Sequence, residues 1–235
     1  MGIWANKLKN ALITGIVMVG LVLPSRSHAG INLSADFWTK YLGAMGFHLE
    51  SQTVIQPAIN VSRNGLYGVL WSNLNRKTGL SEVDYTAGYS RDVKGVGIDV
   101  SYLCCDLREQ GKARANDNMH EIWLILSKKA GDLTGSLVFT QNLSAGSFPD
   151  ARGRNFNFGV GYAPKALVSL EGHVHYNDQY FIPESGFSVA QFTLGVPINF
   201  EHGLAVTPKA VFQLPLNREY FDRDAKFGVA VSRGF

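Results

Sequence analysis

Apolar and polar residues alternate along most of this chain. The pattern is clear in residues 225–235, where Phe227, Val229 and Val231 alternate with polar or small residues and the chain ends on Phe235. An alternation with a period of two predicts a β-strand that has one apolar face and one polar or small face. If the sheet closes into a barrel, this final strand pairs with the first one and closes the ring.

The same alternation recurs between turn-forming residues along the rest of the chain. We expect twelve strands, at 31–38, 54–62, 66–73, 81–90, 96–105, 121–127, 133–142, 155–162, 168–176, 187–200, 204–214 and 225–235. In the third of them, Tyr67, Val69 and Trp71 form the apolar face. In the second, Pro57 is a defect because it removes a backbone donor.

The predicted connections alternate between long polar segments and short turns. The short turns are 63–65, 92–95, 128–131, 163–165 and 201–203, and the long segments include 108–118 and 144–153. This asymmetry and an even strand count are typical of transmembrane β-barrels. The sequence therefore predicts an all-β, up-and-down antiparallel transmembrane β-barrel of about 12 strands, with apolar faces outward and polar faces inward. A soluble, secreted sandwich or barrel, the alternative, gives no reason for the alternating connections.

The N-terminal segment predicts export. Lys7 and Lys9 precede an uncharged, mostly apolar run at 11–23, and small residues stand at 27 and 29. We interpret residues 1–29 as a secretory signal peptide and 30–235 as the barrel. A membrane anchor is the alternative, but the run is shorter than the roughly 20 apolar residues that span a bilayer.

Charge and cysteine content narrow the function classes. Of 22 basic and 19 acidic residues, three basic ones and no acidic ones lie in 1–29, so residues 30–235 are formally neutral. A nucleic-acid partner is therefore not expected. Cys104 and Cys105 are adjacent and form neither a disulfide framework nor a spaced metal motif, so we predict no metal and no cofactor.

Part of the chain resembles a known family. The stretches are Ser-Gln-Thr at 51–53, Pro-Ala at 57–58, Gly-Leu-Tyr-Gly-Val-Leu-Trp-Ser-Asn at 65–73, Glu-Val-Asp at 82–84 and His-Glu-Ile at 120–122. They resemble the TorF-like family of bacterial outer-membrane porins. The chain departs from that family at 48–50, where His-Leu-Glu precedes Ser-Gln-Thr in place of the usual Arg-Gly.

The resemblance implies a location in the bacterial outer membrane, reached through the secretory pathway. The implied partners are outer-membrane lipids and the barrel-assembly machinery; small polar solutes are expected from the charged interior described next. The resemblance of the last strand to those of other outer-membrane barrels implies a membrane-insertion signal formed by Phe227, Val229, Val231 and Phe235.

Charged residues on the polar faces are the candidate lining of the interior. The pore-lining candidates are Asp84, Asp99, Glu121, Glu171, His173, Lys209 and Lys226. The first three lie on strands four to six and the two lysines on strands eleven and twelve. In a ring of twelve these groups face each other, which predicts an acidic wall opposite a basic wall. Such an interior favours passive diffusion of small polar solutes.

Three alternatives stay open. The interior of a twelve-stranded barrel can instead be filled by side chains. The barrel can act structurally or adhesively through its loops, such as 108–118 and 180–184. It can also be a membrane-embedded lipid hydrolase that uses His173 or His175 with Glu171 and Ser169. No nucleophile motif marks a serine, so we assign no catalytic residue and predict no enzyme.

Overall fold

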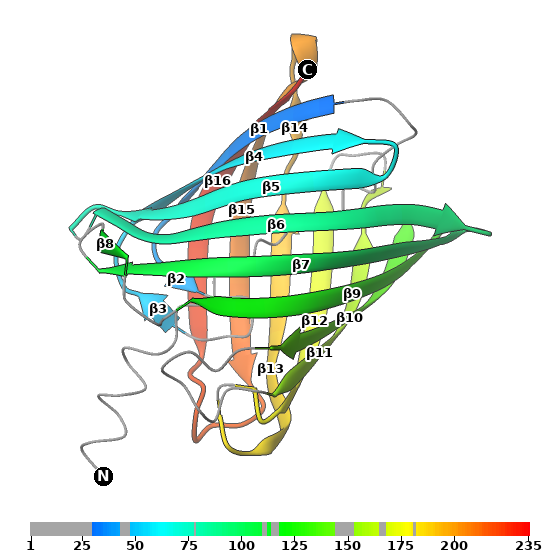
Figure 1. Ribbon diagram of the computed structural model, residues 1–235. Coiled ribbons are helices and arrows are strands. Elements are labelled where there is room, and N and C mark those ends of the chain that lie inside the picture. Colours follow the sequence, from blue (N-terminus) through cyan, green and yellow to red (C-terminus); the bar gives the residue numbers. More distant parts are fainter. Residues whose placement is uncertain are drawn as a thin grey trace.

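The computed structural model describes residues 30–42, 48–77, 79–109, 112–113, 118–143, 153–164, 168–180 and 182–235. The predicted signal peptide and most of the predicted 144–153 loop lie outside the described residues. The chain forms sixteen strands and one 3-10 turn in this part, and Figure 1 shows their arrangement.

Twelve antiparallel strands close into a barrel. In ring order they are β1 (Gly30–Trp38), β4 (Val54–Arg63), β5 (Leu66–Asn75), β6 (Gly79–Val93), β7 (Val96–Glu109), β9 (Met119–Ala130), β10 (Leu133–Asn142), β11 (Arg154–Tyr162), β12 (Ser169–Asp178), β13 (Ser185–Gly195), β15 (Leu204–Pro215) and β16 (Asp224–Gly234). The seam is β1 against β16, from Asn32 opposite Gly234 to Trp38 opposite Gly228. The backbone of Phe235 adds two hydrogen bonds to Ile31. The predicted barrel and its closure by the last strand are confirmed.

Short elements add to this ring. They are β2 (Tyr41–Leu42), β3 (His48–Glu50), β8 (Lys112–Ala113), β14 (Ile198–Asn199) and the 3-10 turn η2 (Glu201–Gly203). Strand β8 pairs with the end of β7, inside a segment where the sequence predicted only a polar loop. Strand β14 pairs with the start of β15.

The two ends of the barrel differ. At one end, which we call the turn end, two-residue turns join β4 to β5 and β6 to β7, and β1 begins and β16 ends there. Asn64-Gly65 and Lys94-Gly95 both have positive φ at both residues, as the tight hairpin turn of a right-twisted sheet requires. The opposite end, which we call the loop end, carries the longer connections.

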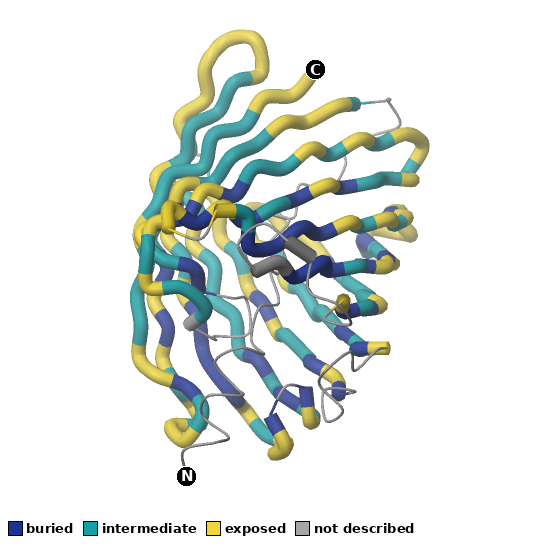
Figure 2. The backbone as a smooth tube through the Cα atoms, turned by 60° about the vertical axis from the view of Figure 1, so that its left-hand side comes forward, coloured by how far each residue is buried: buried dark blue, intermediate teal, exposed yellow. Residues whose placement is uncertain are grey.

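Apolar side chains cover most of the outer face. Tyr85, Phe158 and Phe192 are 48%, 50% and 49% exposed, while Val83, on the face of Tyr85, is only 7% exposed. Exposed and buried residues alternate along many strands in Figure 2, as the period of two requires. A water-soluble protein would rarely expose so much contiguous apolar surface.

The apolar face predicted for strand β5 points into the barrel, although we expected apolar faces to point outward. Val69 and Trp71 are buried in the interior, at 8% and 6% exposure, while Leu66 and Leu70 of the same strand face outward. Both faces of β5 are apolar, so alternation alone could not decide its direction. Packing against other inward aromatic residues, described below, decides it.

Two boundaries also differ from the prediction. Strands β5 and β6 are joined by residues 76–78 alone, so the expected alternation of long and short connections breaks at this point. The predicted strand 187–200 ends at Gly195 and resumes only as β14, because Pro197 has no N–H to donate.

None of the described residues belongs to a helix long and apolar enough to cross a membrane.

Candidate functional site: the interior of the barrel

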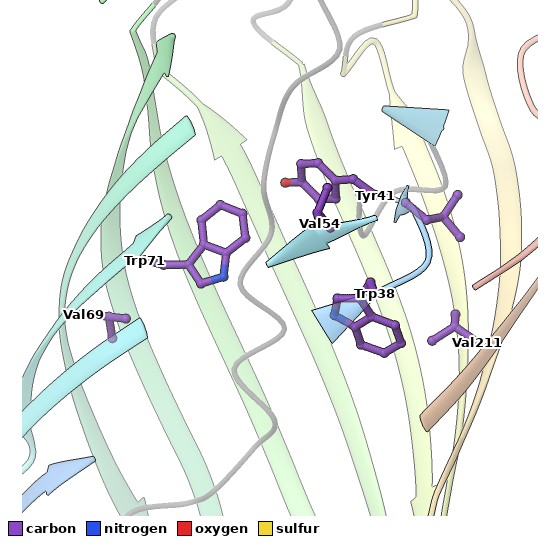
Figure 3. Close-up of a cluster of buried hydrophobic side chains, with 7 residues drawn as sticks. Trp38, Tyr41, Val54, Val69, Trp71 and Val211 are labelled. Atoms are coloured by element: carbon purple, nitrogen blue, oxygen red, sulfur yellow. The ribbon is translucent and has the colours of Figure 1, made fainter. Parts of the chain in front are cut away.

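A short hairpin formed by β2 and β3 lies inside the barrel, and we call it the inner hairpin. It belongs to the connection between β1 and β4, where the sequence predicted only a link. Tyr41 and Leu42 are 2% and 3% exposed and pack in a cluster with Trp38, Val54, Val69, Trp71 and Val211. Figure 3 shows these side chains within the barrel, with Trp71 and Tyr41 facing each other; their ring centroids are 6.1 Å apart.

Hydrogen bonds fasten the inner hairpin to both sides of the ring. Tyr41 donates to Glu82 of β6 at 3.1 Å, and Lys226 of β16 donates to the carbonyl of Leu42 at 3.0 Å. Burial raises the pKa of Tyr41 well above its usual value, and Glu82 and Asp84 raise it further, so the phenol keeps its proton and can donate. The hairpin therefore bridges strands that stand far apart in the ring.

Glu50 is the polar anchor of the inner hairpin. Its carboxylate accepts hydrogen bonds from Asn73 at 3.1 Å, from Ser81 at 2.9 Å and from Asn75. These donors lie on β5 and β6, and Asn73 also donates to Ser81 at 2.8 Å. The departure from the TorF-like pattern at 48–50 thus places a carboxylate where two strands supply donors for it.

Two further connections reach into the loop end. Tyr180 and Ile182, between β12 and β13, pack with Val189 and with Phe221, between β15 and β16. Leu49 of the inner hairpin contacts this cluster and the cluster of Trp71, which joins the two. The loop end of the interior is therefore filled with packed side chains.

The acidic wall lies beneath this packing. Glu82, Asp84 and Glu121 are all 0% exposed. Glu121 accepts from the indole N–H of Trp123 at 2.8 Å and from the hydroxyl of Tyr180. Asp84 and Glu121 thus occupy inward positions, as expected, but they are buried and not open to a water path. Sequence reasoning missed Glu82, although it stands on the same face as Asp84.

The basic wall is arranged around Trp38. The ammonium of Lys226 lies 4.4 Å from the centroid of the Trp38 ring, and that of Lys209 lies 6.0 Å from it. Lys209 also approaches Asp36 at 3.6 Å, with both side chains about 30% exposed. In the observed ring order β15 and β16 stand opposite β6, β7 and β9, so the acidic and basic residues lie on opposite walls.

The turn-end half of the interior is more open. Asp99 accepts from the hydroxyl of Tyr67 at 2.7 Å and is partly exposed. Glu171 lies 3.7 Å from Nε2 of His173, whose Nδ1 lies 3.0 Å from Oδ1 of Asn157. Whether the seven pore-lining candidates border a conducting path stays a prediction.

The hydrolase candidates do not assemble into a nucleophile with its base. Ser169 and His173 are four residues apart on β12, which separates them by about 13 Å. Both ring nitrogens of His175 are buried without a hydrogen-bond partner. Glu171 and His173 are close, but neither of them activates Ser169.

The terminal strand presents the predicted residues outward. Phe227 is 52% and Phe235 65% exposed, and Val229 and Val231 share their face. Their role as an insertion signal stays a prediction.

Comparisons with known proteins show the fold. No family model and no curated protein matches the chain. Solved structures do match: a KdgM porin in complex with disordered oligogalacturonate has a TM-score of 0.56 and 11% identity, with 88% of this chain and 99% of that one covered. A NanC porin has a TM-score of 0.56 and 11% identity, with 86% and 98% covered. The outer membrane phospholipase A from Escherichia coli has a TM-score of 0.51 and 11% identity, with 88% and 93% covered. The chain shares the barrel fold of these outer-membrane proteins, which include both channels and an enzyme.

Proposed function

We propose that this protein is an outer-membrane porin that lets small polar solutes diffuse passively through a narrow, polarised interior. The observation that carries the proposal is the closed twelve-stranded barrel with an apolar outer face and charged residues on two opposite inner walls. An apolar outer face is compatible with lipid. The closed ring also leaves no strand edge with unpaired backbone groups in the bilayer. The barrel fold shared with two porins supports this function.

The direction of charge separation suggests the class of solute. The partly exposed carboxylate of Asp99 on β7 stands across the ring from Lys209 on β15, so the field runs across the passage. Such a field favours solutes that carry separated positive and negative groups over apolar ones. We therefore propose small dipolar solutes as the cargo, with the inner hairpin as the narrowest element of the path.

The TorF-like resemblance supports a finer assignment. Trp71, Asn73, Glu82, Asp84 and Glu121 belong to the resembling stretches, and they meet at or beside the inner hairpin and the acidic wall. We propose membership of that family on this basis. The outward face of β16 then serves as the signal for the assembly machinery.

Planar-bilayer recording tests the porin function. We expect the protein to give small single-channel currents, and the double variant Tyr41→Ala with Glu50→Ala to give larger ones, because it removes the hydrogen bonds from the hairpin to β5 and β6. Glu201→Ala, in an exposed turn at the other end, serves as the control and leaves the current unchanged. Background currents from both the protein and the double variant would refute the porin proposal.

A non-conducting structural or adhesive barrel is the second candidate. The specific observation in its favour is the filling of the loop end by the inner hairpin and the clusters around Trp71 and Tyr180. It predicts that the double variant stays closed. The hydrolase alternative predicts lipid-ester cleavage that disappears in His173→Ala, and the separation of Ser169 from His173 speaks against it.

A further inference from the structure

The acidic wall contains a compact group of possible metal ligands on neighbouring strands. Asp84 of β6 stands directly opposite Cys105 of β7, and Glu82 lies two residues away on the same inner face. All three residues are 0% exposed. One ligand atom from each, the Cys105 sulfur and one carboxylate oxygen each from Glu82 and Asp84, lie within 4.8 Å of one another.

Asp84 is the member of this group that points to a ligand. Both of its carboxylate oxygens are buried without a hydrogen-bond partner. Glu82, by contrast, accepts from Tyr41 at 3.1 Å and from the thiol of Cys105 at 3.2 Å. A buried carboxylate is costly unless a cation or a set of donors compensates it.

The lysines of the basic wall do not supply the positive charge that Asp84 needs. Lys226 is held against Trp38 and the carbonyl of Leu42, and Lys209 lies near Asp36. Both lysines stand on strands across the ring from Asp84. A bound ion would compensate Asp84 without any movement of these side chains.

We propose that Glu82, Asp84 and Cys105 bind one divalent cation, and that Zn²⁺ is the ion that fits best. A thiolate with two carboxylates is a ligand set that favours Zn²⁺ over Mg²⁺ or Ca²⁺, which prefer oxygen alone. Tetrahedral bonds to Zn²⁺ place ligand atoms about 3.3–3.6 Å apart. The sulfur and one oxygen of Glu82 already lie 3.2 Å apart, and ligand atoms of all three residues lie within 4.8 Å of one another, so they can supply three of the four positions and leave the fourth to water. The thiol of Cys105 loses its proton to solvent when the ion binds.

The site would also fasten the inner hairpin. Glu82 holds Tyr41 through its other oxygen, so the ion fixes the acceptor on which the hairpin rests. The adjacent Cys104 is a matched control, because neighbouring residues of a strand point to opposite faces and Cys104 therefore faces outward. Asp99 is an inward carboxylate on the neighbouring strand β7. It accepts a hydrogen bond from Tyr67 and is a matched control for Asp84.

Metal titration of the full-length folded protein in detergent micelles tests the proposal without reference to transport. The protein is folded in the presence of Zn²⁺, because the ligands are buried, and bound metal is counted after removal of free ions. We expect one Zn²⁺ per chain, an affinity lower by at least about tenfold in Cys105→Ser and in Asp84→Asn, and no change in Cys104→Ser or Asp99→Asn.

Cobalt provides a second measurement that needs no variant of the site. Folding with Co²⁺ should give the near-ultraviolet charge-transfer absorption of a cobalt–thiolate bond in the unmodified protein and in Cys104→Ser. This readout decides the question if Cys105→Ser does not fold. The proposal is overturned if no Zn²⁺ binds or if bound Co²⁺ shows no thiolate band. It is also overturned if the band is lost in Cys104→Ser and kept in Cys105→Ser.

Discussion

The two halves of the barrel interior have the same strand pattern and different contents. At the loop end, Trp71, Tyr41, Glu82 and Asp84 are buried, because the inner hairpin and two further connections pack on the wall. At the turn end, the inward carboxylates Asp99 and Glu171 are partly exposed. The ring strands determine which side chains point inward, and the connections between strands determine whether the space inside the barrel is filled.

The largest expected effect compares two inward aromatic residues of one strand. Trp71→Ala should lower the free energy of unfolding by about 3–5 kcal/mol, because it removes a buried ring at the centre of the loop-end cluster. Tyr67→Ala, nearer the turn end of β5, should cost less, about 2–3 kcal/mol, because its ring is only partly buried at the edge of this cluster and donates one hydrogen bond to Asp99. Denaturant unfolding of the protein in lipid vesicles measures both. Equal losses would contradict the difference between the halves.

A smaller effect is expected where the seam meets the loop-end packing. A Cβ atom on Gly228 would lie 2.2 Å from the carbonyl oxygen of Phe37 and 2.4 Å from the Trp38 ring. Gly228→Ala should therefore destabilise the barrel by about 2–3 kcal/mol and lower its melting temperature. Gly135→Ala is the control, because a Cβ on Gly135 meets nothing within 4 Å. A Gly228→Ala barrel that melts with the unmodified protein would show that the seam can relax.

The smallest energetic effect concerns the more open part of the basic wall. Lys209→Gln removes a partly exposed ion pair with Asp36, so its cost in stability should stay below about 1 kcal/mol. The loss of one positive charge should nevertheless shift the reversal potential in a salt gradient toward cation preference. Lys94→Gln, in an exposed turn, should leave the reversal potential unchanged. An unchanged reversal potential would remove Lys209 from the conducting path.

The resemblance and the packing converge on the same residues. The sequence identified Trp71 and Asp84 as parts of family-like stretches without indicating that they meet in space. In the structure they are paired on neighbouring strands beneath one hairpin, whose Tyr41 packs against the Trp71 ring and donates to Glu82, two residues from Asp84. The contact between distant segments, and not the stretches themselves, gives these residues a shared environment.

The sequence by itself determined the twelve strands of the ring, the closing role of β16 and the opposite placement of acidic and basic residues, because a period of two assigns each residue to a face whatever lies beyond it. Only the tertiary structure decided the direction of β5, the descent of β2 and β3 into the interior and the meeting of Glu82, Asp84 and Cys105. These features depend on which apolar surfaces find partners inside a closed ring. A strand with two apolar faces, such as β5, and a connection with no period, such as that between β1 and β4, carry no local signal of that choice.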